Sequence, residues 1–269
     1  MKRFASLNIV REGKVDFVEI DYGPLNVLDE VLAKDLCSYV ESVEHDDELM
    51  VIVFKTANPD FFIAYHDPRY FLKQQSPESQ ATLKNIQKVI ITLLSWDKVT
   101  IGQLRGRSTG GGSEFIMAMD MRFAAMGKTF IRHAEVSLGF VPCKGGTQLL
   151  PRMLGKARAL ELILNGKFMN TDQLERYGYI NAALAESVLS NHVRKMALRI
   201  ASFSKDAVRG AKALVVQNTK FDLDAFNREQ DVFHTLVETP EAHRRFRLFI
   251  DFVESKSDLT IDEPNWDQR

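Results

Sequence analysis

Two glutamates in neighbouring glycine-rich segments are the residues best suited to chemistry. Glu114 follows Gly110, Gly111 and Gly112, and Glu135 stands about twenty residues later. Three glycines let a backbone approach a ligand closely and leave main-chain N–H groups exposed where a helix begins, which suits an oxygen that gains negative charge. Two carboxylates could then act as general acid and general base, provided that the fold brings them together.

The same loop also fits a second chemistry. The residues around Ser108 match GxSxG, the pattern of a serine nucleophile held on a turn between a strand and a helix. A serine hydrolase is therefore an open alternative. Against it, the chain turns mainly helical after this loop, whereas a Ser-His-acid enzyme needs further strand ends to deliver its acid and its histidine. The later histidines fall in helix-patterned segments instead.

Three kinds of cofactor motif fail when their spacing is tested. Gly127-Lys128-Thr129 resembles the end of a P-loop, but Arg122 stands where the first glycine belongs. The glycines of 102–110 do not keep the dinucleotide-binding spacing. The six histidines form no cluster with Cys37 and Cys143, so we expect no metal site. Two cysteines fit a reduced compartment better than a disulfide framework.

Strands and helices alternate in the first half of the chain. Hydrophobic residues at strand and helix spacing predict these segments. They are a hairpin that turns at 12–14, a helix over 28–43, a strand LMVIVFKT, a loop ANPDFFIAYHDPRYF, a helix from Ser76 to about Trp96 and a strand VTIGQLRG. This order places the glycine-rich loop directly after a strand, and the helix SEFIMAMD that follows carries Glu114.

The second half begins with strands and becomes mostly helical. MRFAAM and TFIRHA are predicted to be extended, and SLGFVPCKGGT is predicted to be a loop. Helices follow from about 148, interrupted by a short strand YINAAL, and continue roughly over 185–253 before a polar arm or loose tail. The whole pattern predicts an α/β core with a helical C-terminal extension.

Composition excludes several partner classes. The 269 residues are 45% apolar and 26% charged, which is typical of a globular protein. The 35 Lys and Arg against 36 Asp and Glu leave no basic field for a nucleic acid or an anionic membrane. No apolar run approaches the roughly 20 residues that span a bilayer, and the N-terminus lacks the apolar stretch of a secretory signal. We therefore expect a cytoplasmic protein.

Motifs in one consistent order resemble the enoyl-CoA hydratase/isomerase (crotonase) superfamily over nearly the whole chain, most specifically over 106–181. They are GPLNVLDEVLAKDL, FFIAYHD (similar to the family's F-x-A-G-A-D loop), G-x-x-x-GGG-S-E-F-x-M-A-x-D, and AEVSLGFVPCKGGTQLLPRMLGKARALELILNGKFMNTDQLERYGYIN. The resemblance implies an α/β fold: a crotonase (ClpP-like) spiral of ββα units over 1–200. It also implies a C-terminal helical region over 201–269 that assembles trimers or hexamers.

The resemblance further implies an acyl-CoA thioester substrate, with coenzyme A as part of the substrate and no separate cofactor. The family polarises the thioester carbonyl with two main-chain N–H groups, which match those of His66 and Gly111. The catalytic glutamates of its hydratases match Glu114 and Glu135. Both acids together favour hydration of a 2-enoyl-CoA. Isomerase, decarboxylase or thioester hydrolase chemistry, and a catalytically degenerate CoA-binding protein, are the alternatives.

Residues beside these positions are expected to bind the substrate, and some depart from the family pattern. The expected binding residues are Ala64, Tyr65, Asp67 and Gly110. Tyr65 and the following His66 replace the usual Gly and Ala.

Two arginines are further departures. Arg107 stands at a commonly apolar position, and Arg132 comes three residues before Glu135. A cation paired with Glu135 would lower its pKa and weaken it as an acid. Alternatively, these arginines could bind a carboxylated acyl group or a CoA phosphate.

Overall fold

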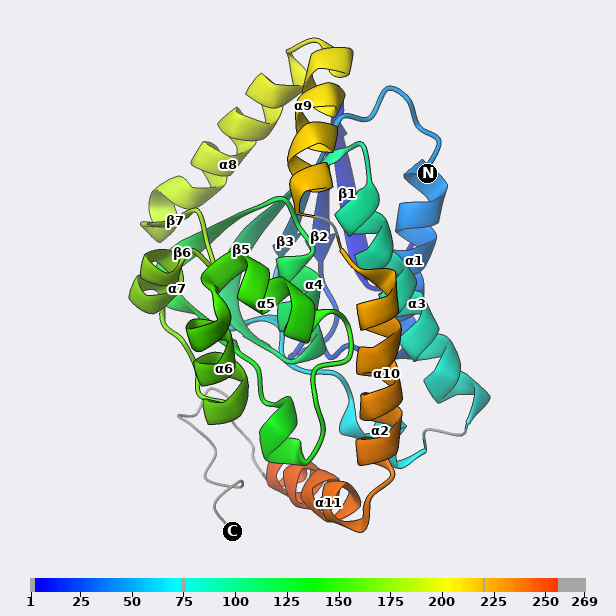
Figure 1. The fold of residues 1–269 in the computed structure, drawn as a ribbon. Coiled ribbons are helices and arrows are strands. Elements are labelled where there is room, and N and C mark those ends of the chain that lie inside the picture. Colours follow the sequence, from blue (N-terminus) through cyan, green and yellow to red (C-terminus); the bar gives the residue numbers. More distant parts are fainter. Residues whose placement is uncertain (1–2, 74–75, 220, 256–269) are drawn as a thin grey trace.

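One mixed sheet forms the centre of the molecule (Figure 1). The computed structural model describes residues 3–73, 76–219 and 221–255. Its strands are β1 (Leu7–Glu12), β2 (Val15–Ile20), β3 (Val51–Thr56), β4 (Phe61–Ile63), β5 (Val99–Thr109), β6 (Met121–Arg132) and β7 (Ala182–Leu184). They pair in the order β1-β2-β3-β5-β6-β7, with β4 beside β5. The β1–β2 hairpin is antiparallel as predicted, and the other pairs are parallel.

Helices alternate with the strands, most of them in the predicted places. They are α1 (Glu30–Val43), α2 (Pro68–Leu72), α3 (Pro77–Ser95), α4 (Gly111–Met117), α5 (Gly146–Leu154), α6 (Lys156–Asn165), α7 (Thr171–Tyr177), α8 (Glu186–Ala201), α9 (Lys205–Asn218), α10 (Leu223–Val237) and α11 (Pro240–Glu254). Asp29 begins α1 and Ser76 begins α3, each by accepting first-turn N–H groups. The α/β class is therefore confirmed.

Apolar side chains cover both faces of the sheet. On one face α8 packs Leu189, Val193 and Ala197 onto residues of β2, β3, β5 and β6. On the other face α1, α3, α4, α5, α6 and α7 share a larger core. Burial on both faces explains why the central strands are continuous apolar runs rather than alternating ones. Parallel strands also bring their carboxyl ends to one edge, which is where the glycine-rich loop leaves the sheet.

The segment predicted as the loop ANPDFFIAYHDPRYF is more regular than expected. It contains β4 and α2. Asn26 Nδ2 donates to the carbonyl oxygens of Phe61 and Phe62, which holds β4 from a distant part of the chain. Asp67 caps α2, and Pro68 occupies its first turn. The loop prediction was wrong because it weighed the two prolines and missed this long-range hydrogen bonding.

Two smaller corrections concern the region around Glu135. MRFAAM and TFIRHA form one continuous strand, β6, rather than two extended segments. The loop SLGFVPCKGGT begins within a 3-10 turn over Glu135–Leu138, and α5 begins at Gly146 inside the predicted loop. This turn matters for the candidate site, because it holds Glu135 three residues after the end of β6.

Helices α10 and α11 pack beside the segments that follow the carboxyl ends of the strands. A third apolar cluster joins α2, α10 and α11 to the turn after Glu135 through Phe71, Phe140, Phe233 and Phe246. The ring centroids of Phe71 and Phe246 lie 5.4 Å apart. The proposed division between 1–200 and 201–269 stays a prediction, and the predicted polar tail falls mostly within 256–269, outside the described residues.

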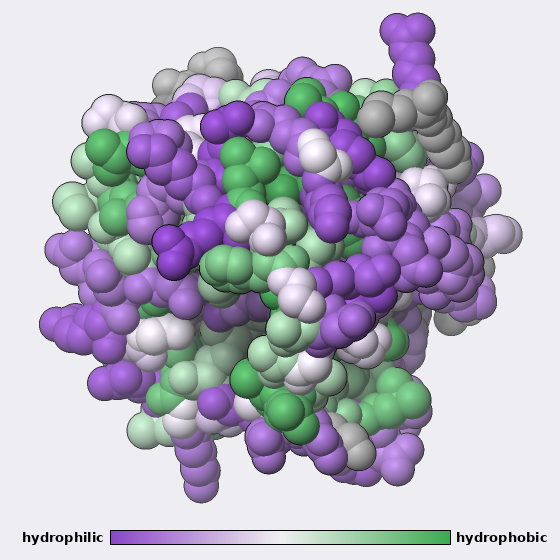
Figure 2. Space-filling model, turned by 90° about the horizontal axis from the view of Figure 1, so that it is seen from above, coloured by the Kyte–Doolittle hydropathy of each residue, from purple (hydrophilic) through white to green (hydrophobic). Residues whose placement is uncertain are grey.

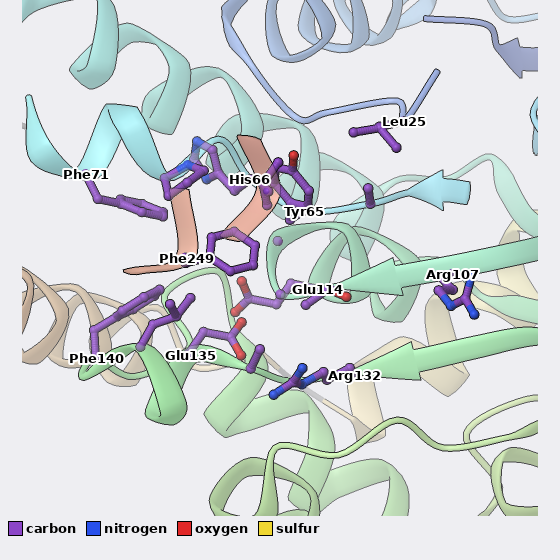
Figure 3. Close-up of a pocket in the computed structure, with 18 of the residues that line it drawn as sticks. Leu25, Tyr65, His66, Phe71, Arg107, Glu114, Arg132, Glu135, Phe140 and Phe249 are labelled. Carbon is purple, nitrogen blue, oxygen red and sulfur yellow. The ribbon is translucent and has the colours of Figure 1, made fainter. Parts of the chain in front are cut away.

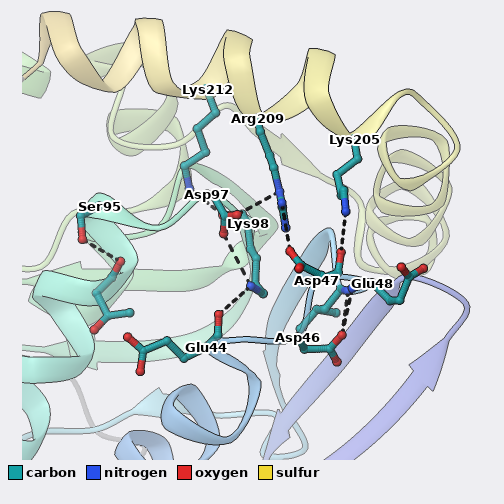
Figure 4. A network of polar contacts seen from close by, with 12 residues as sticks. Glu44, Asp46, Asp47, Glu48, Ser95, Asp97, Lys98, Lys205, Arg209 and Lys212 are labelled. Carbon is teal, nitrogen blue, oxygen red and sulfur yellow. Dashed lines mark hydrogen bonds and ion pairs between the residues drawn. The ribbon is translucent and has the colours of Figure 1, made fainter.

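Helix α9 differs from the other long helices because none of its residues is buried. Lys212 of α9 reaches Asp120 at 2.6 Å. Arg209 of the same helix reaches Asp97 at 2.9 Å and Asp47 at 3.2 Å (Figure 4). Meanwhile Leu214 and Val215 are 65% and 66% exposed. Figure 2, which views the molecule from above, shows apolar groups among the hydrophilic ones at the end that carries α8 and α9 in Figure 1.

Several apolar positions of the helices that follow β7 are already used within the chain. Val193, Phe226 and Phe233 are buried, and Met196, Leu198 and Ile200 pack on the core beneath α8. Exposed apolar side chains that the core does not use remain on α9, including Leu214 and Val215. No helix in the described part of the chain is both long and apolar enough to cross a membrane.

Candidate active site

The ends of β5 and β6 bring the two glutamates together. These strands are parallel neighbours, and their last residues, Thr109 and Arg132, are paired. The Gly110 N–H and the Ser113 hydroxyl then donate to the Arg132 carbonyl at 3.0 and 2.9 Å. This lateral bonding holds the start of α4, which carries Glu114, against the chain that leads to Glu135. Two residues far apart in sequence thus share one site.

Each glycine of the Gly110–Gly112 run has its own structural reason. Gly110 has a φ of 56°, and a β-carbon there would lie 3.3 Å from Glu135 Oε1. A β-carbon at Gly112 would lie 2.7 Å from the Ser108 hydroxyl and 2.8 Å from the Ile63 side chain. A β-carbon at Gly111 would lie 3.2 Å from the Leu28 side chain and 3.4 Å from Lys144 Nζ. The run therefore lets the backbone enter a space crowded with functional groups.

A cavity of about 1040 Å³, its open mouth included, surrounds these glycines. The carboxylates of Glu114 and Glu135 face one another near its centre (Figure 3). Arg107 and Arg132 lie on one side of them, and aromatic residues including Phe71 and Phe140 lie on the other. Helix α11 contributes Phe249, Phe252 and Val253 to the lining, so the C-terminal region helps to enclose the site.

Glu114 is held by backbone on one side of its carboxylate. It is fully buried, and its Oε1 accepts the N–H groups of Lys144 at 2.7 Å and Gly146 at 3.1 Å. Its Oε2 accepts no hydrogen bond from the described residues and lies 3.9 Å from Lys144 Nζ. Burial raises the pKa of Glu114, while the Lys144 charge and these N–H groups oppose the rise. One oxygen is thus anchored, and the other is left for chemistry.

Glu135 has none of that support. It is 4% exposed, and neither of its carboxylate oxygens accepts a hydrogen bond from a described residue. Burial, followed by the charge of Glu114, raises the pKa of Glu135 to about 8. The sequence raised the possibility that Arg132 would lower this pKa. The structure gives the opposite direction, and Arg132 lies over the Phe168 ring with its guanidinium 5.6 Å from the ring centroid.

Lys144 is a functional candidate that the sequence motifs did not identify. It is 1% exposed, lines the cavity, and its Nζ lies 3.2 Å from Cys143 Sγ. A buried lysine is rare without a charged partner, and Glu114 is the nearby carboxylate here. The available signal in the sequence was its place between VPC and GG, in the predicted loop SLGFVPCKGGT.

Glu229 of α10 is a second residue that sequence reasoning missed. It is 5% exposed and accepts the N–H groups of Gly145 at 2.6 Å and Thr147 at 2.9 Å, together with the Thr147 hydroxyl. The turn that it clamps supplies the N–H groups that bind Glu114. Burial, then the charge of Glu114, raises the pKa of Glu229 to about 7. No local pattern in α10 predicts this role, because the partners are more than eighty residues earlier.

Removal of the Glu229 carboxylate should loosen that turn. We expect Glu229→Ala to lower the free energy of unfolding by about 1–3 kcal/mol, because two main-chain donors lose their buried acceptor. Urea denaturation followed by circular dichroism measures this loss. Asp224 is an exposed acidic residue of the same helix, so Asp224→Ala is the control and should change the same free energy far less. Equal effects of both variants would refute the clamp.

The main-chain N–H groups of His66 and Gly111 are available to a ligand. Tyr65 O accepts from Leu28 N and Asp67 N donates to Leu28 O, so the His66 N–H between them points away from Leu28. Gly111 begins α4, where an N–H group has no partner within the helix. Among the described residues neither N–H finds an acceptor. Both residues line the cavity, which matches the expected pair of donors to a thioester oxygen.

The imidazole of His66 is neutral and buried. Burial, followed by the charge of Lys144, holds the pKa of His66 well below its usual value. Neither ring nitrogen forms a hydrogen bond with the described residues, and the ring packs against Phe71 with centroids 4.9 Å apart. The side chain therefore packs as an apolar ring beside the aromatic side of the cavity.

The expected binding residues divide into two groups. Ala64, Tyr65 and Gly110 line the cavity, and Tyr65 packs edge-on against Phe249 with ring centroids 5.3 Å apart. Asp67 does not line it: its carboxylate caps α2 through the Arg69 N–H and pairs with the Arg69 guanidinium at 2.8 Å. The Asp67 carboxylate therefore holds the loop together and does not line the cavity, where it was expected to contact the substrate.

Ser108 does not behave as the nucleophile of a serine hydrolase. It lies within β5 rather than on a turn, is 1% exposed, and donates its hydroxyl to the Ile63 carbonyl at 3.1 Å. It is also not among the residues that line the described cavity. The GxSxG pattern arises because its two glycines pack closely against the backbone before β4 and against Glu135, where a side chain would not fit.

A search for metal ligands gives no candidate in the described ranges. Residues 3–73, 76–219 and 221–255 contain no group of three or more His, Cys, Asp or Glu side chains placed to hold a metal ion.

Comparison with known proteins agrees with this geometry. The chain is 28% identical to a short-chain-enoyl-CoA hydratase of Clostridium acetobutylicum over 90% of this chain and 93% of that protein. It is also 28% identical to a crotonyl-CoA hydratase of Syntrophomonas wolfei over 84% and 87% of the two chains. A solved structure of a putative enoyl-CoA hydratase from Streptomyces avermitilis aligns with a TM-score of 0.87 at 28% identity, covering 97% and 96%.

The fold is thus the crotonase fold of these relatives. The sequence model described as enoyl-CoA hydratase/isomerase matches residues 12–259, which is most of the chain. The protein is therefore an enzyme of the enoyl-CoA hydratase/isomerase family.

Proposed function

We propose that this enzyme hydrates a 2-enoyl-CoA thioester. One observation carries the proposal: two buried glutamates face one another in a cavity that also presents two unused main-chain N–H groups. A single acid suffices for the shift of a double bond, whereas the addition of water requires one group to take a proton and another to give one. The names of the relatives from C. acetobutylicum and S. wolfei support the same reaction.

The reaction follows from the different settings of the two carboxyl groups. The N–H groups of His66 and Gly111 would bind the thioester oxygen and stabilise the negative charge that develops on it. Glu114 takes a proton from water as the water oxygen bonds to the β-carbon, and the electrons of the double bond move toward the thioester. Glu135 then gives its proton to the α-carbon. Both groups act from the same side, which favours syn addition.

We propose a short acyl group as the substrate. The aromatic side of the cavity is bounded by Phe71, Phe140 and the buried His66 ring, whose neighbours belong to a packed cluster. A long acyl chain would have to displace that cluster, at a cost of the order of 1–3 kcal/mol for each overpacked position. The chain has two cysteines, Cys37 and Cys143, and both are buried, which supports a reducing compartment such as the cytoplasm.

The test is incubation with a panel of 2-enoyl-CoAs of increasing chain length. Loss of the conjugated thioester absorbance measures turnover, and mass spectrometry identifies the product. We expect a product heavier by one water, formed fastest from the shortest acyl groups. A product of unchanged mass would favour isomerisation, release of free CoA would favour hydrolysis, and loss of carbon dioxide from carboxylated acyl groups would favour decarboxylation.

The pKa of Glu135 predicts how hydration depends on pH. Hydration uses the protonated form of Glu135, whose pKa is about 8 in the folded protein. The value of kcat/KM for hydration should therefore fall about tenfold for each pH unit above this value, on the alkaline side of a maximum whose acidic limb reports protonation of Glu114. Dehydration of a 3-hydroxyacyl-CoA needs the same single proton on the pair of glutamates, and the equilibrium constant of hydration does not depend on pH, so kcat/KM for dehydration should fall in parallel. Initial rates in both directions between pH 6 and about 10 check the prediction, and a hydration profile that does not fall above the pKa of Glu135 would contradict it.

We also propose that the enzyme is a trimer or hexamer. The motivation is the exposed apolar surface of α9, including Leu214 and Val215, which the chain itself does not cover. Light scattering at micromolar concentration should give three or six times the chain mass, and Leu214→Glu should shift it toward one. Leu164→Glu is the matched control, because Leu164 is also 65% exposed but lies on α6. A monomeric unmodified chain would refute the assembly.

A further inference from the structure

Lys144 places a positive charge beside the glutamate pair. Its Nζ lies 3.9 Å from Glu114 Oε2, and its own main-chain N–H donates to Glu114 Oε1 at 2.7 Å. The side chain is 2% exposed, and the nearest hydrogen-bond partner of Nζ is the Cys143 thiol at 3.2 Å. A thiol is a weak acceptor, so the strong interaction open to this ammonium group is with the carboxylate of Glu114.

One ammonium group and two carboxyl groups share the buried space around Glu114. Two carboxyl groups face one another away from water, and burial of an unpaired charge is costly enough that such a group takes up a proton instead. One ammonium group can compensate one carboxylate. Glu114 has the ammonium group at 3.9 Å and two backbone N–H donors, whereas Glu135 accepts no hydrogen bond from a described residue and feels the Lys144 charge less than the Glu114 charge. The compensated charge therefore belongs on Glu114, and the proton belongs on Glu135.

We propose that Lys144 is a positioning residue that holds the single negative charge of the pair on Glu114 and so leaves Glu135 protonated. This inference rests on the proposed hydration, because it assigns the base and the acid of that reaction. Without Lys144 the two buried carboxyl groups would compete for one proton or both be neutral, and a neutral Glu114 cannot take a proton from water.

The same charge would also reset the enzyme after each turnover. When hydration is complete, Glu114 carries the proton taken from water, and Glu135 is ionised. The negative charge then lies on the carboxylate that has no hydrogen-bond donor among the described residues, while Lys144 faces a neutral Glu114. Return of a proton from Glu114 to Glu135, directly or through a water molecule, restores the ion pair. Lys144 thus favours the starting protonation state over the spent one.

Other titratable groups near Lys144 do not replace it. The neighbouring Cys143 is a neutral thiol, because burial holds its pKa far above the usual range. His66 is neutral for the reason given above. The carboxylate of Glu229 accepts the N–H groups of Gly145 and Thr147. Tyr179 has a pKa far above neutrality because of burial. The cavity also contains Arg107 and Arg132, on the side away from the aromatic residues.

The kinetic experiment compares Lys144→Met, which removes the charge, with Lys144→Arg, which keeps it. In the pH profile of kcat/KM for enoyl-CoA hydration, Lys144→Met should move the acidic limb, which reports ionisation of Glu114, upward by about one unit or more. At pH 7 kcat should fall about tenfold or more, while KM changes much less. Lys144→Arg should recover most of that loss. An acidic limb that does not move in folded Lys144→Met protein would overturn the proposal.

A matched control separates the charge effect from loss of a buried lysine. The Lys212 side chain is 8% exposed and pairs with Asp120 at 2.6 Å, and Lys212 lies on helix α9 and is not among the residues that line the cavity. Lys212→Met should therefore leave the pH profile of kcat/KM unchanged. Circular dichroism and thermal melting report whether each variant is folded.

A second measurement needs no turnover and separates failure of this inference from failure of the proposed function. Infrared spectra at pH 7 distinguish a carboxylate from a carboxylic acid. The difference between the unmodified enzyme and Glu114→Gln should show loss of a carboxylate, and the difference from Glu135→Gln should show loss of an acid. In the Lys144→Met background, Glu114→Gln should remove an acid instead. If Glu114 is protonated in the unmodified enzyme, the proposal is wrong even if hydration is observed.

Discussion

Glu114→Gln and Glu135→Gln should each lower kcat for enoyl-CoA hydration by about 10²–10⁴-fold. Glutamine has nearly the size of glutamate but neither takes nor releases a proton under these conditions. Glu114 holds one oxygen on the N–H groups of Lys144 and Gly146, and a glutamine oxygen can keep those contacts. The loss should therefore appear in kcat, with binding of the CoA thioester largely kept. Steady-state rates and calorimetric titration with a non-reactive acyl-CoA measure the two quantities separately.

A difference in kcat between the two glutamate variants would decide between two kinds of chemistry. If only one substitution lowers kcat by this factor, hydration by a pair of acids is wrong, and a chemistry with one acid, such as isomerisation, becomes the better assignment. The Glu229→Gln variant is the matched control, because Glu229 is also buried and ionisable but touches the turn rather than the cavity. Its effect on kcat should be far smaller than either of the other two.

The sequence could predict the site where the local backbone determines it. Three glycines followed by a glutamate indicate a strand that ends in a helix N-terminus, and β5 and α4 meet there. The proximity of Glu135 could not be read from its spacing, because it depends on β5 and β6 being parallel neighbours whose last residues are paired. The resemblance to a known family supplied that pairing in place of a physical derivation.

Other features of the site lie beyond any local pattern. Glu229 is one acidic residue among several on an amphipathic helix, and only the folded chain brings it to the turn at Gly145. The raised pKa of Glu135 likewise depends on burial, whereas the arginines nearby in the sequence argue for the opposite direction. The segment of β4 and α2 was mistaken for a loop because its hydrogen bonds come from Asn26, more than thirty residues earlier.

His66→Ala should keep most of the hydratase activity, whereas His66→Pro should lose about 10²–10³-fold in kcat. The proposed contribution of His66 is its main-chain N–H, which alanine retains and proline lacks. Loss of one oxyanion donor costs on the order of 3–4 kcal/mol of transition-state stabilisation. The imidazole itself is a poor general acid or base here. Burial and the charge of Lys144 keep its pKa well below the usual value. Neither ring nitrogen forms a hydrogen bond with a described residue.

Folding must be checked separately, because both substitutions act on a packed loop. Alanine removes a ring that packs 4.9 Å from the Phe71 ring, so some loss of thermal stability is expected without a matching loss of kcat. Proline also restricts Tyr65, the preceding residue, whose carbonyl accepts from Leu28. Circular dichroism and binding of a non-reactive acyl-CoA show whether each variant keeps its fold and its cavity. If folded His66→Ala binds the thioester yet is as inactive as the glutamate variants, then the imidazole takes part in the reaction, and the assignment of the N–H as the sole contribution of His66 is wrong.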